Sequence, residues 1–157
     1  MNTSDVLENC IRIERILGEI YDIFREQQAA CPEYVRLWEK TAQEEHNHEQ
    51  QFLLAKRLAC SMKTDAAESD QPSNELVGKL TALKARVAAR KLSPAESLRL
   101  AIELEEKLSA FHMDQMHIFS DAATNTLFTS MMNNDNNHVE ALKQAYAQLA
   151  QPPHDQE

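Results

Sequence analysis

Glycine and proline are rare in this chain, with only two glycines and five prolines among 157 residues. A β-sheet protein of this length needs many tight turns, which use these residue types freely, whereas long helices avoid both. The composition therefore excludes an all-β fold and favours long helices. Hydrophobic residues make up 43% of the chain, which is enough for one buried core, and the length is too small for two full-sized domains.

Apolar residues recur every three or four positions through most of the chain, as they do on the buried face of a helix. This spacing predicts four long helices and a shorter one, over residues 3–28, 32–62, 75–91, 93–119 and 122–150. The fourth helix begins with Ser93, Pro94 and Glu96, which match a capping box with proline in the first turn. Residues 63–74 have no large apolar side chain and are expected to form a mobile connector, and residues 151–157 a frayed tail.

The lengths of the links predict how these helices are connected. Short links join the first helix to the second and the fourth to the fifth, whereas the link between these pairs is long. Two antiparallel hairpins joined by a long crossover, which contains the short helix, form a four-helix bundle. We therefore expect residues 1–150 to form a single all-α domain. The short helix has a basic side, and we expect it to lie against the bundle, with a membrane or partner surface as the alternative.

Charge and cysteine content narrow the class of protein. The net charge of −9 argues against a nucleic-acid-binding protein, which needs a surplus of Lys and Arg. There is no apolar run long enough to span a membrane and no basic-then-apolar signal at residue 1, so no membrane or secretory role is expected. Cys10, Cys31 and Cys60 form no CxxC pair, which predicts reduced thiols and a cytoplasmic location.

The first hairpin resembles the second in sequence. Residues Ile11–Glu14 recur as Ile102–Glu105, 91 positions later, and Glu45–His48 recur as Asp135–His138, 90 positions later. Two separate features with nearly equal offsets indicate an internal repeat. In a bundle with pseudo-two-fold symmetry, corresponding residues of the two hairpins would face each other.

Six polar residues of this repeat fall on the apolar faces of their predicted helices. They are Glu14, Glu45, His48, Glu105, Asp135 and His138. Burying four ionised carboxylates together is strongly unfavourable, and these faces carry no Lys or Arg to compensate. Two divalent cations would balance four carboxylates and two neutral histidines. The spacing of an acid three residues before a histidine places both side chains within reach of one ion, and such oxygen-rich sites suit iron or manganese better than zinc.

Four segments resemble the ferritin-like superfamily and, within it, the rubrerythrin group of di-iron proteins. The segments are IRIERILGEIYDIF, WEKTAQEEHNHEQQF, LSPAESLRLAIELEEKLSAFH and NNDNNHVEAL. The resemblance covers all four long helices and implies a ferritin-like four-helix bundle with two iron ions, for which manganese or zinc can substitute. It implies that Glu14 and Glu105 are terminal ligands, that Glu45 and Asp135 bridge the metals, and that each metal binds one histidine.

The resemblance also places a supporting aromatic residue seven positions after each terminal ligand. Tyr21 occupies the first of these positions, where its hydroxyl is expected to support ligands of the opposite half. His112 occupies the second, where we expect a partner of the ligands, with an added ligand or a space-filling residue left open. Other acidic residues, Glu49 among them, are expected on exposed helix faces, and His46 is expected to be solvated.

The chain departs from the rubrerythrin pattern in several respects. Asp135 stands where the group usually has Glu, so its carboxylate reaches about 1.5 Å less far. The surrounding segment, residues 133–137, forms helices poorly, and we expect a strained helical turn there, with a loop as the alternative. Leu108 stands where rubrerythrins have an extra carboxylate. No cysteine-rich rubredoxin module is present, so electrons would come from a separate protein such as rubredoxin or its reductase.

The resemblance implies a function in iron redox chemistry. The expected activity is rubrerythrin-like, either reduction of peroxide or oxidation of ferrous iron by O₂ or peroxide, and a homodimer is expected. A non-catalytic protein that carries, buffers or senses iron is the main alternative, because the chain lacks an electron-donor module and has the shorter Asp135. A third hypothesis is a metal-free helical bundle that acts as an interaction module. Apolar residues would then be expected at the six ligand positions.

Overall fold

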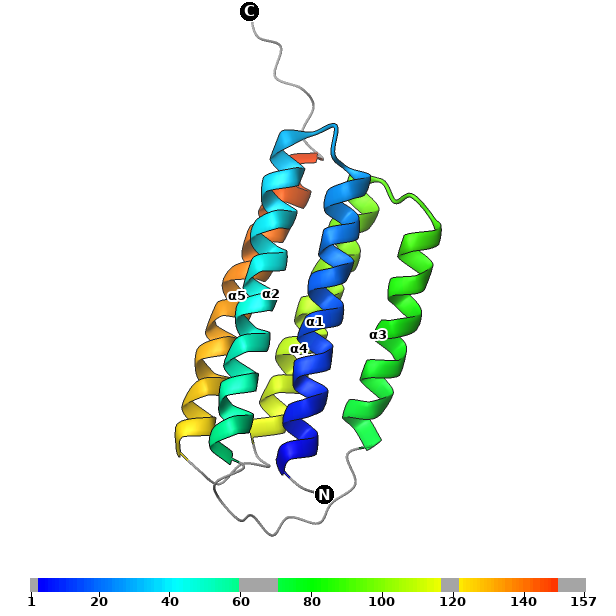
Figure 1. Ribbon diagram of the computed structural model, residues 1–157. Coiled ribbons are helices and arrows are strands. Elements are labelled where there is room, and N and C mark those ends of the chain that lie inside the picture. The colour runs from blue at the N-terminus through cyan, green and yellow to red at the C-terminus, as the bar shows by residue number, and fades with distance from the viewer. Residues whose placement is uncertain (1–2, 60–70, 117–121, 150–157) are drawn as a thin grey trace, which may run out of the picture. The chain divides into compact units, whose positions relative to one another are not determined.

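Helices and the short links between them make up the described part of the chain. The computed structural model describes residues 3–59, 71–116 and 122–149, and Figure 1 shows them as α1 (Thr3–Gln27), α2 (Pro32–Ala59), α3 (Gln71–Ala89), α4 (Pro94–Met116) and α5 (Ala122–Leu149). These ranges contain no strand, which confirms the all-α prediction. In the same ranges no helix is long and apolar enough to cross a membrane.

The helices lie where hydrophobic spacing places them, with one clear difference. α3 begins at Gln71, earlier than the predicted residue 75, because Pro72 suits a first helical turn and the polar residues after it contact α1. The predicted connector over residues 63–74 therefore overlaps α3, and residues 63–70 lie outside the described residues, as does the predicted tail at 151–157. α5 continues through residues 133–137, which confirms the helical interpretation of that segment over a loop.

The chain divides into two compact units, Met1–Lys91, which contains α1, α2 and α3, and Leu92–Glu157, which contains α4 and α5. We refer to them as unit 1 and unit 2. The single domain over residues 1–150 stays a prediction.

In unit 1, α1 and α2 form an antiparallel hairpin. The start of α1 contacts the end of α2 through an ion pair between Glu8 and Lys56. The end of α1 leads to Gln28, whose side-chain oxygen accepts a hydrogen bond of 2.9 Å from Trp38 near the start of α2. Contacts that join early residues of one helix to late residues of the other define antiparallel packing.

Three aromatic rings fill the part of this hairpin near the α1–α2 turn. Tyr21 stacks on Trp38 with ring centroids 5.9 Å apart, and Phe24 meets Trp38 edge to face at 5.1 Å. All three residues are fully buried. Large rings in these geometries contribute about 0.5–1.5 kcal/mol per pair beyond their hydrophobic burial, so they fix the distance between α1 and α2.

α3 packs parallel to α1 and is held by polar contacts near both ends. The amide of Asn9 donates hydrogen bonds to Ser73 at 3.0 Å and to Asn74 at 3.3 Å, and the amide of Gln27 donates to the carbonyl of Val87 at 2.7 Å. Between these ends, buried Val77, Leu80 and Val87 supply the apolar face. The packing of α3 against a neighbouring helix, with its basic residues Lys79 and Arg86 exposed, agrees with the expected role of a crossover helix.

Unit 2 is an antiparallel hairpin of α4 and α5 whose interface is apolar. Buried residues from both helices form this interface: Leu98, Ala101, Leu104, Leu108, Phe128, Met131 and Leu142. An ion pair of 2.7 Å joins Lys143 to Glu106 at its edge.

α4 begins with the capping box that the sequence predicts. The Glu96 carboxylate accepts hydrogen bonds from the Ser93 amide at 2.9 Å and from the Ser93 hydroxyl at 2.8 Å. In return the Glu96 amide donates to the Ser93 hydroxyl at 3.3 Å. This exchange satisfies amides that the first turn of a helix otherwise leaves unbonded.

Replacing Ser93 by alanine tests the contribution of this cap. We expect Ser93→Ala to lower the free energy of unfolding by about 1 kcal/mol, because the first turn of α4 loses its hydroxyl partner. Urea unfolding followed by helical circular dichroism measures the effect. The matched control Ser93→Thr keeps a hydroxyl and should stay close to the parent; an equal loss in both variants would contradict the assignment.

Candidate metal centre

Glu14 lies on the buried face of α1, one turn from apolar neighbours on both sides. Cys10 precedes it by four residues and Leu17 follows it by three, and all three side chains are buried. This spacing places them on one helical stripe, so the fold that buries Cys10 and Leu17 also buries Glu14. The carboxylate has no exposed surface, as the sequence predicts.

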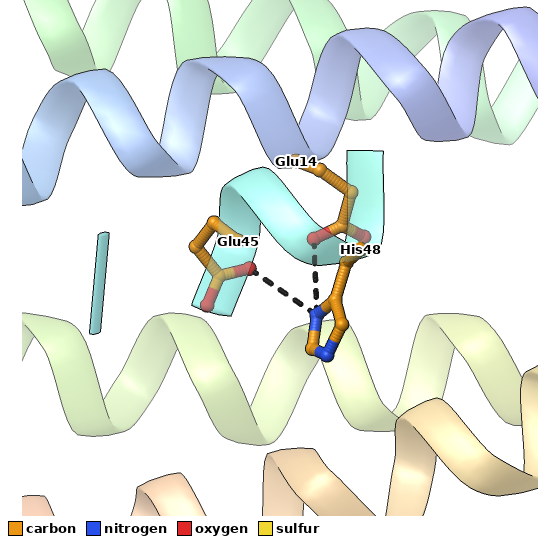
Figure 2. Close-up of side chains that lie close together, drawn as sticks. All are labelled: Glu14, Glu45 and His48. Carbon is orange, nitrogen blue, oxygen red and sulfur yellow. Dashed lines mark ion pairs between the residues drawn. The ribbon is translucent and has the colours of Figure 1, made fainter. Parts of the chain in front are cut away.

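α2 brings Glu45 and His48 to the same place. The two residues are three positions apart and therefore share a face of the helix, where Glu45 is 0% and His48 is 2% exposed. The Nδ1 atom of His48 lies 3.7 Å from a carboxylate oxygen of Glu14 and 3.7 Å from one of Glu45, as the dashed lines in Figure 2 show. Two carboxylates and one imidazole from two helices thus converge inside unit 1.

This cluster has the chemistry and dimensions of a metal half-site. One ligand atom from each of Glu14, Glu45 and His48 lies within 4.8 Å of the others. Ligand atoms about 2.0–2.2 Å from a shared ion are at most about 4.4 Å apart, so small side-chain adjustments suffice. Carboxylate oxygens and a histidine nitrogen are ligands that divalent transition-metal ions accept. The three residues therefore fit a divalent cation.

The two carboxylates determine the protonation of His48 when no metal is bound. Burial by itself lowers the pKa of a histidine, because it disfavours the charged ring. Contacts with Glu14 and Glu45 more than offset burial and raise the pKa of His48 from 6.5 to about 11. At neutral pH the ring is then an imidazolium that balances one negative charge. A metal ion that binds His48 has to displace this proton.

Glu49 is buried beside the cluster, although the sequence analysis placed it on an exposed face. Its carboxylate accepts hydrogen bonds from Arg15 at 2.6 and 3.0 Å, and His46 lies 3.5 Å away. The prediction was wrong because it considered α2 alone. Arg15 follows Glu14 just as Glu49 follows His48, so helices that bring Glu14 to His48 also bring Arg15 to Glu49. His46 is exposed, as expected.

Unit 2 contains a corresponding pair of predicted ligands. Glu105 on α4 and His138 on α5 are both buried, and a carboxylate oxygen of Glu105 lies within 4.8 Å of a ring nitrogen of His138. His112, seven residues after Glu105 on α4, is also buried. The centroid of its ring lies 5.9 Å from that of Phe111 and 6.0 Å from that of Phe128. Its role beside the ligands stays a prediction.

The predicted ligand Asp135 and the predicted supporting residue Tyr21 both lie on described helices. α5 includes Asp135, but its side chain lies outside what the structure describes, so its role as a ligand stays a prediction. Tyr21 is buried and stacks on Trp38. The support that its hydroxyl gives to ligands of the other half stays a prediction as well.

Comparison with models of known protein families, with curated proteins and with solved structures finds no match for this chain. The case for a metal centre therefore depends on the residues themselves.

The raised pKa of His48 predicts how the stability of the metal-free protein changes with pH. The folded protein keeps the proton of His48 up to about pH 11, whereas an unfolded histidine loses it near 6.5. The stabilisation is fully present below pH 6.5 and is lost as the pH rises toward 11, at no more than about 1.4 kcal/mol per pH unit. Urea unfolding in the presence of a chelator at a series of pH values measures this loss.

The control for this measurement is His48→Gln, which cannot be protonated. Groups that do not contact the cluster contribute equally in both proteins, so the difference between the two pH profiles reports on His48 and the two carboxylates coupled to it. We expect the parent protein to lose more stability than His48→Gln as the pH rises above 6.5. Parallel profiles would show that His48 is not held as an imidazolium.

Proposed function

We propose that the protein is a ferritin-like di-iron carboxylate protein, in which the predicted ligands of units 1 and 2 bind two iron ions within one four-helix bundle. The internal repeat supports this arrangement, because each unit contributes one helical hairpin with an acid and a histidine three residues apart. The proposed ligand set is the one that the sequence analysis assigned. Iron is the proposed metal, with manganese or zinc as substitutes.

The burial of Glu14, Glu45 and His48 around one point is the observation that carries this proposal. Two buried carboxylates destabilise a helix interface unless a positive charge is close by. With His48 protonated, the cluster keeps one net negative charge. With His48 neutral and a divalent cation bound, the cluster has no net charge. A divalent cation would therefore neutralise the negative charge that protonated His48 leaves uncompensated.

The donor atoms favour iron or manganese over zinc. Each half-site in the proposal has carboxylate oxygens and a single imidazole, and no cysteine sulfur is part of the ligand set. Zinc sites more often have fewer oxygens and a lower coordination number. Fe²⁺ and Mn²⁺ accept more oxygen ligands and leave positions for a small substrate.

Bound iron would supply redox chemistry toward a small oxidant. Two bound ferrous ions would supply one electron each, which balances the reduction of one hydrogen peroxide and two protons to two waters. The side chains of Glu14, Glu45 and His48 would hold one of the ions at a fixed, buried place. Oxidation of ferrous iron as a substrate is the second form of this activity.

Repeated turnover would require electrons from outside the chain. We propose a separate electron-donor protein such as rubredoxin or its reductase, a cytoplasmic location and a homodimeric state. These proposals rest on the resemblance to rubrerythrins. A protein that only carries, buffers or senses iron would bind the metals in the same way and need no donor.

Anaerobic loading with Fe²⁺ tests the proposal directly. We expect two ions to bind per chain, and addition of peroxide to raise near-ultraviolet absorbance as ferric iron forms, with one peroxide consumed per two ions. Continued peroxide consumption with a reductase and an electron carrier would favour an enzyme, whereas a single round would favour the non-catalytic alternative. Failure to bind any divalent metal would refute both and favour a metal-free interaction module.

The variant Glu14→Gln tests whether the buried cluster is the binding site. Loss of one carboxylate should weaken binding of one ion by about tenfold or more, because a charged ligand is replaced by a neutral one. Isothermal titration with Mn²⁺ or Fe²⁺ measures the affinity. The matched control Glu26→Gln makes the same change at an exposed position of α1 and should bind like the parent. Equal affinities of the two variants would place the metal elsewhere.

A further inference from the structure

A cavity of about 370 Å³ lies between α1 and α2 in unit 1. Its lining includes Glu14, Gly18 and Glu49, together with the more exposed Glu19 and Asp22. All of its lining residues belong to these two helices. The cavity therefore connects the side of the helix pair, where exposed residues lie, to a buried residue of the proposed metal centre.

Glu14 belongs to both the cavity and the metal-ligand cluster. It lines the cavity and also contributes a ligand atom within 4.8 Å of those of Glu45 and His48. Figure 2 shows its carboxylate directed toward His48. Both oxygens of this carboxylate are covered, so an ion in the cavity reaches them when the Glu14 side chain rotates, without separation of the two helices.

Gly18 lines this cavity one helical turn after Glu14. A Cβ atom added to Gly18 would lie 3.6 Å from the carbonyl oxygen of Ala42 and 3.6 Å from Cβ of Glu45, which is ordinary van der Waals contact. The position therefore faces α2 immediately beside a second proposed ligand. Because glycine has no side chain, α1 forms the cavity wall with backbone atoms alone at this point.

The charge of the lining favours cations. Five carboxylates and two arginines line the cavity, so negative charge exceeds positive charge. One of the arginines, Arg15, is paired with Glu49 at 2.6 Å. At the outer side, the side chains of Glu19 and Asp22 are 46% and 47% exposed, and they pair with Lys84 at 2.7 Å and with Arg25 at 3.0 Å. A cleft lined by charge of one sign concentrates ions of the opposite sign and accelerates their association.

We propose that this cavity is the route by which divalent cations reach the metal centre from solvent, and that Gly18 keeps the route open. The proposal rests on the proposed metal-binding function and adds the path and the residues that control it. At the exposed end the ion competes with Lys84 and Arg25 for the carboxylates of Glu19 and Asp22. Glu49, buried beside Arg15, is the next carboxylate, and Glu14 receives the ion as its first ligand.

The variant Gly18→Leu tests this route by placing a bulky side chain in the cavity wall. Stopped-flow absorbance with Co²⁺ and metal-free protein measures the association rate, and equilibrium titration measures the dissociation constant. We expect association to slow by about tenfold or more, because the ion has to wait for the side chain to move. The dissociation constant should change little, since blocking a path slows entrance and exit alike.

The control Gly78→Leu makes the same substitution in α3, where an added Cβ meets no atom within 4 Å. It should associate with Co²⁺ as fast as the parent protein. Gly18→Ala adds only the contacts at 3.6 Å and should slow association far less than Gly18→Leu. An unchanged Co²⁺ association rate in Gly18→Leu would overturn the proposed route and leave the proposed metal centre unaffected. A parent protein that binds no Co²⁺ would refute the proposed function itself.

A second variant tests the route without altering the interface between α1 and α2. The double substitution Glu19→Gln with Asp22→Asn removes ion pairs with Lys84 and Arg25, but these side chains are about half exposed, so the folded structure should be retained. We expect slower Co²⁺ association and a weaker dependence of the rate on salt, because the attraction at the exposed end is reduced. The same rate and salt dependence as in Glu26→Gln would overturn the role of these two residues.

Discussion

The neutralisation of two buried carboxylates governs the structure of unit 1. Glu14 and Glu45 come from adjacent helices and have no exposed surface, and an ionised carboxylate in such a place costs several kcal/mol even after relaxation. His48 is the positive group nearest to both, at 3.7 Å from each. One imidazolium cannot balance two carboxylates, so the α1–α2 interface retains a negative charge. This residual charge supports the proposal that a divalent cation binds here.

Packing on either side of the cluster keeps the two helices together despite this charge. The stacked rings of Tyr21 and Trp38 lie toward the turn between α1 and α2, and the ion pair of Glu8 with Lys56 lies toward the other end. Repulsion between carboxylates would separate α1 and α2 if only flexible contacts joined them. Rigid aromatic packing resists this separation, so Glu14, Glu45 and His48 stay close together.

The sequence predicted well the helices and the burial of the five proposed ligands whose side chains the structure describes, because both follow from the spacing of apolar residues along one helix. Glu14 and His48 lie on apolar stripes, and Ser93 begins α4 with the expected capping box. The burial of Glu49 depends instead on Arg15 in a different helix, and periodicity within one helix contains no information about such a partner. The early start of α3 has the same origin, because its polar first turn, which includes Ser73, is stabilised by contacts with α1.

Gly18 links the stability of α1 to access to the ligands. A glycine inside a helix is less favourable than alanine by about 1 kcal/mol, and α1 has its glycine one turn after Glu14. Packing does not require it, because an added Cβ would be in ordinary contact with Glu45. A helix optimised for stability alone would have alanine or a larger apolar residue here. In the proposed route, glycine leaves space beside a buried proposed ligand at the expense of helix stability. Function and stability then place opposite demands on this position.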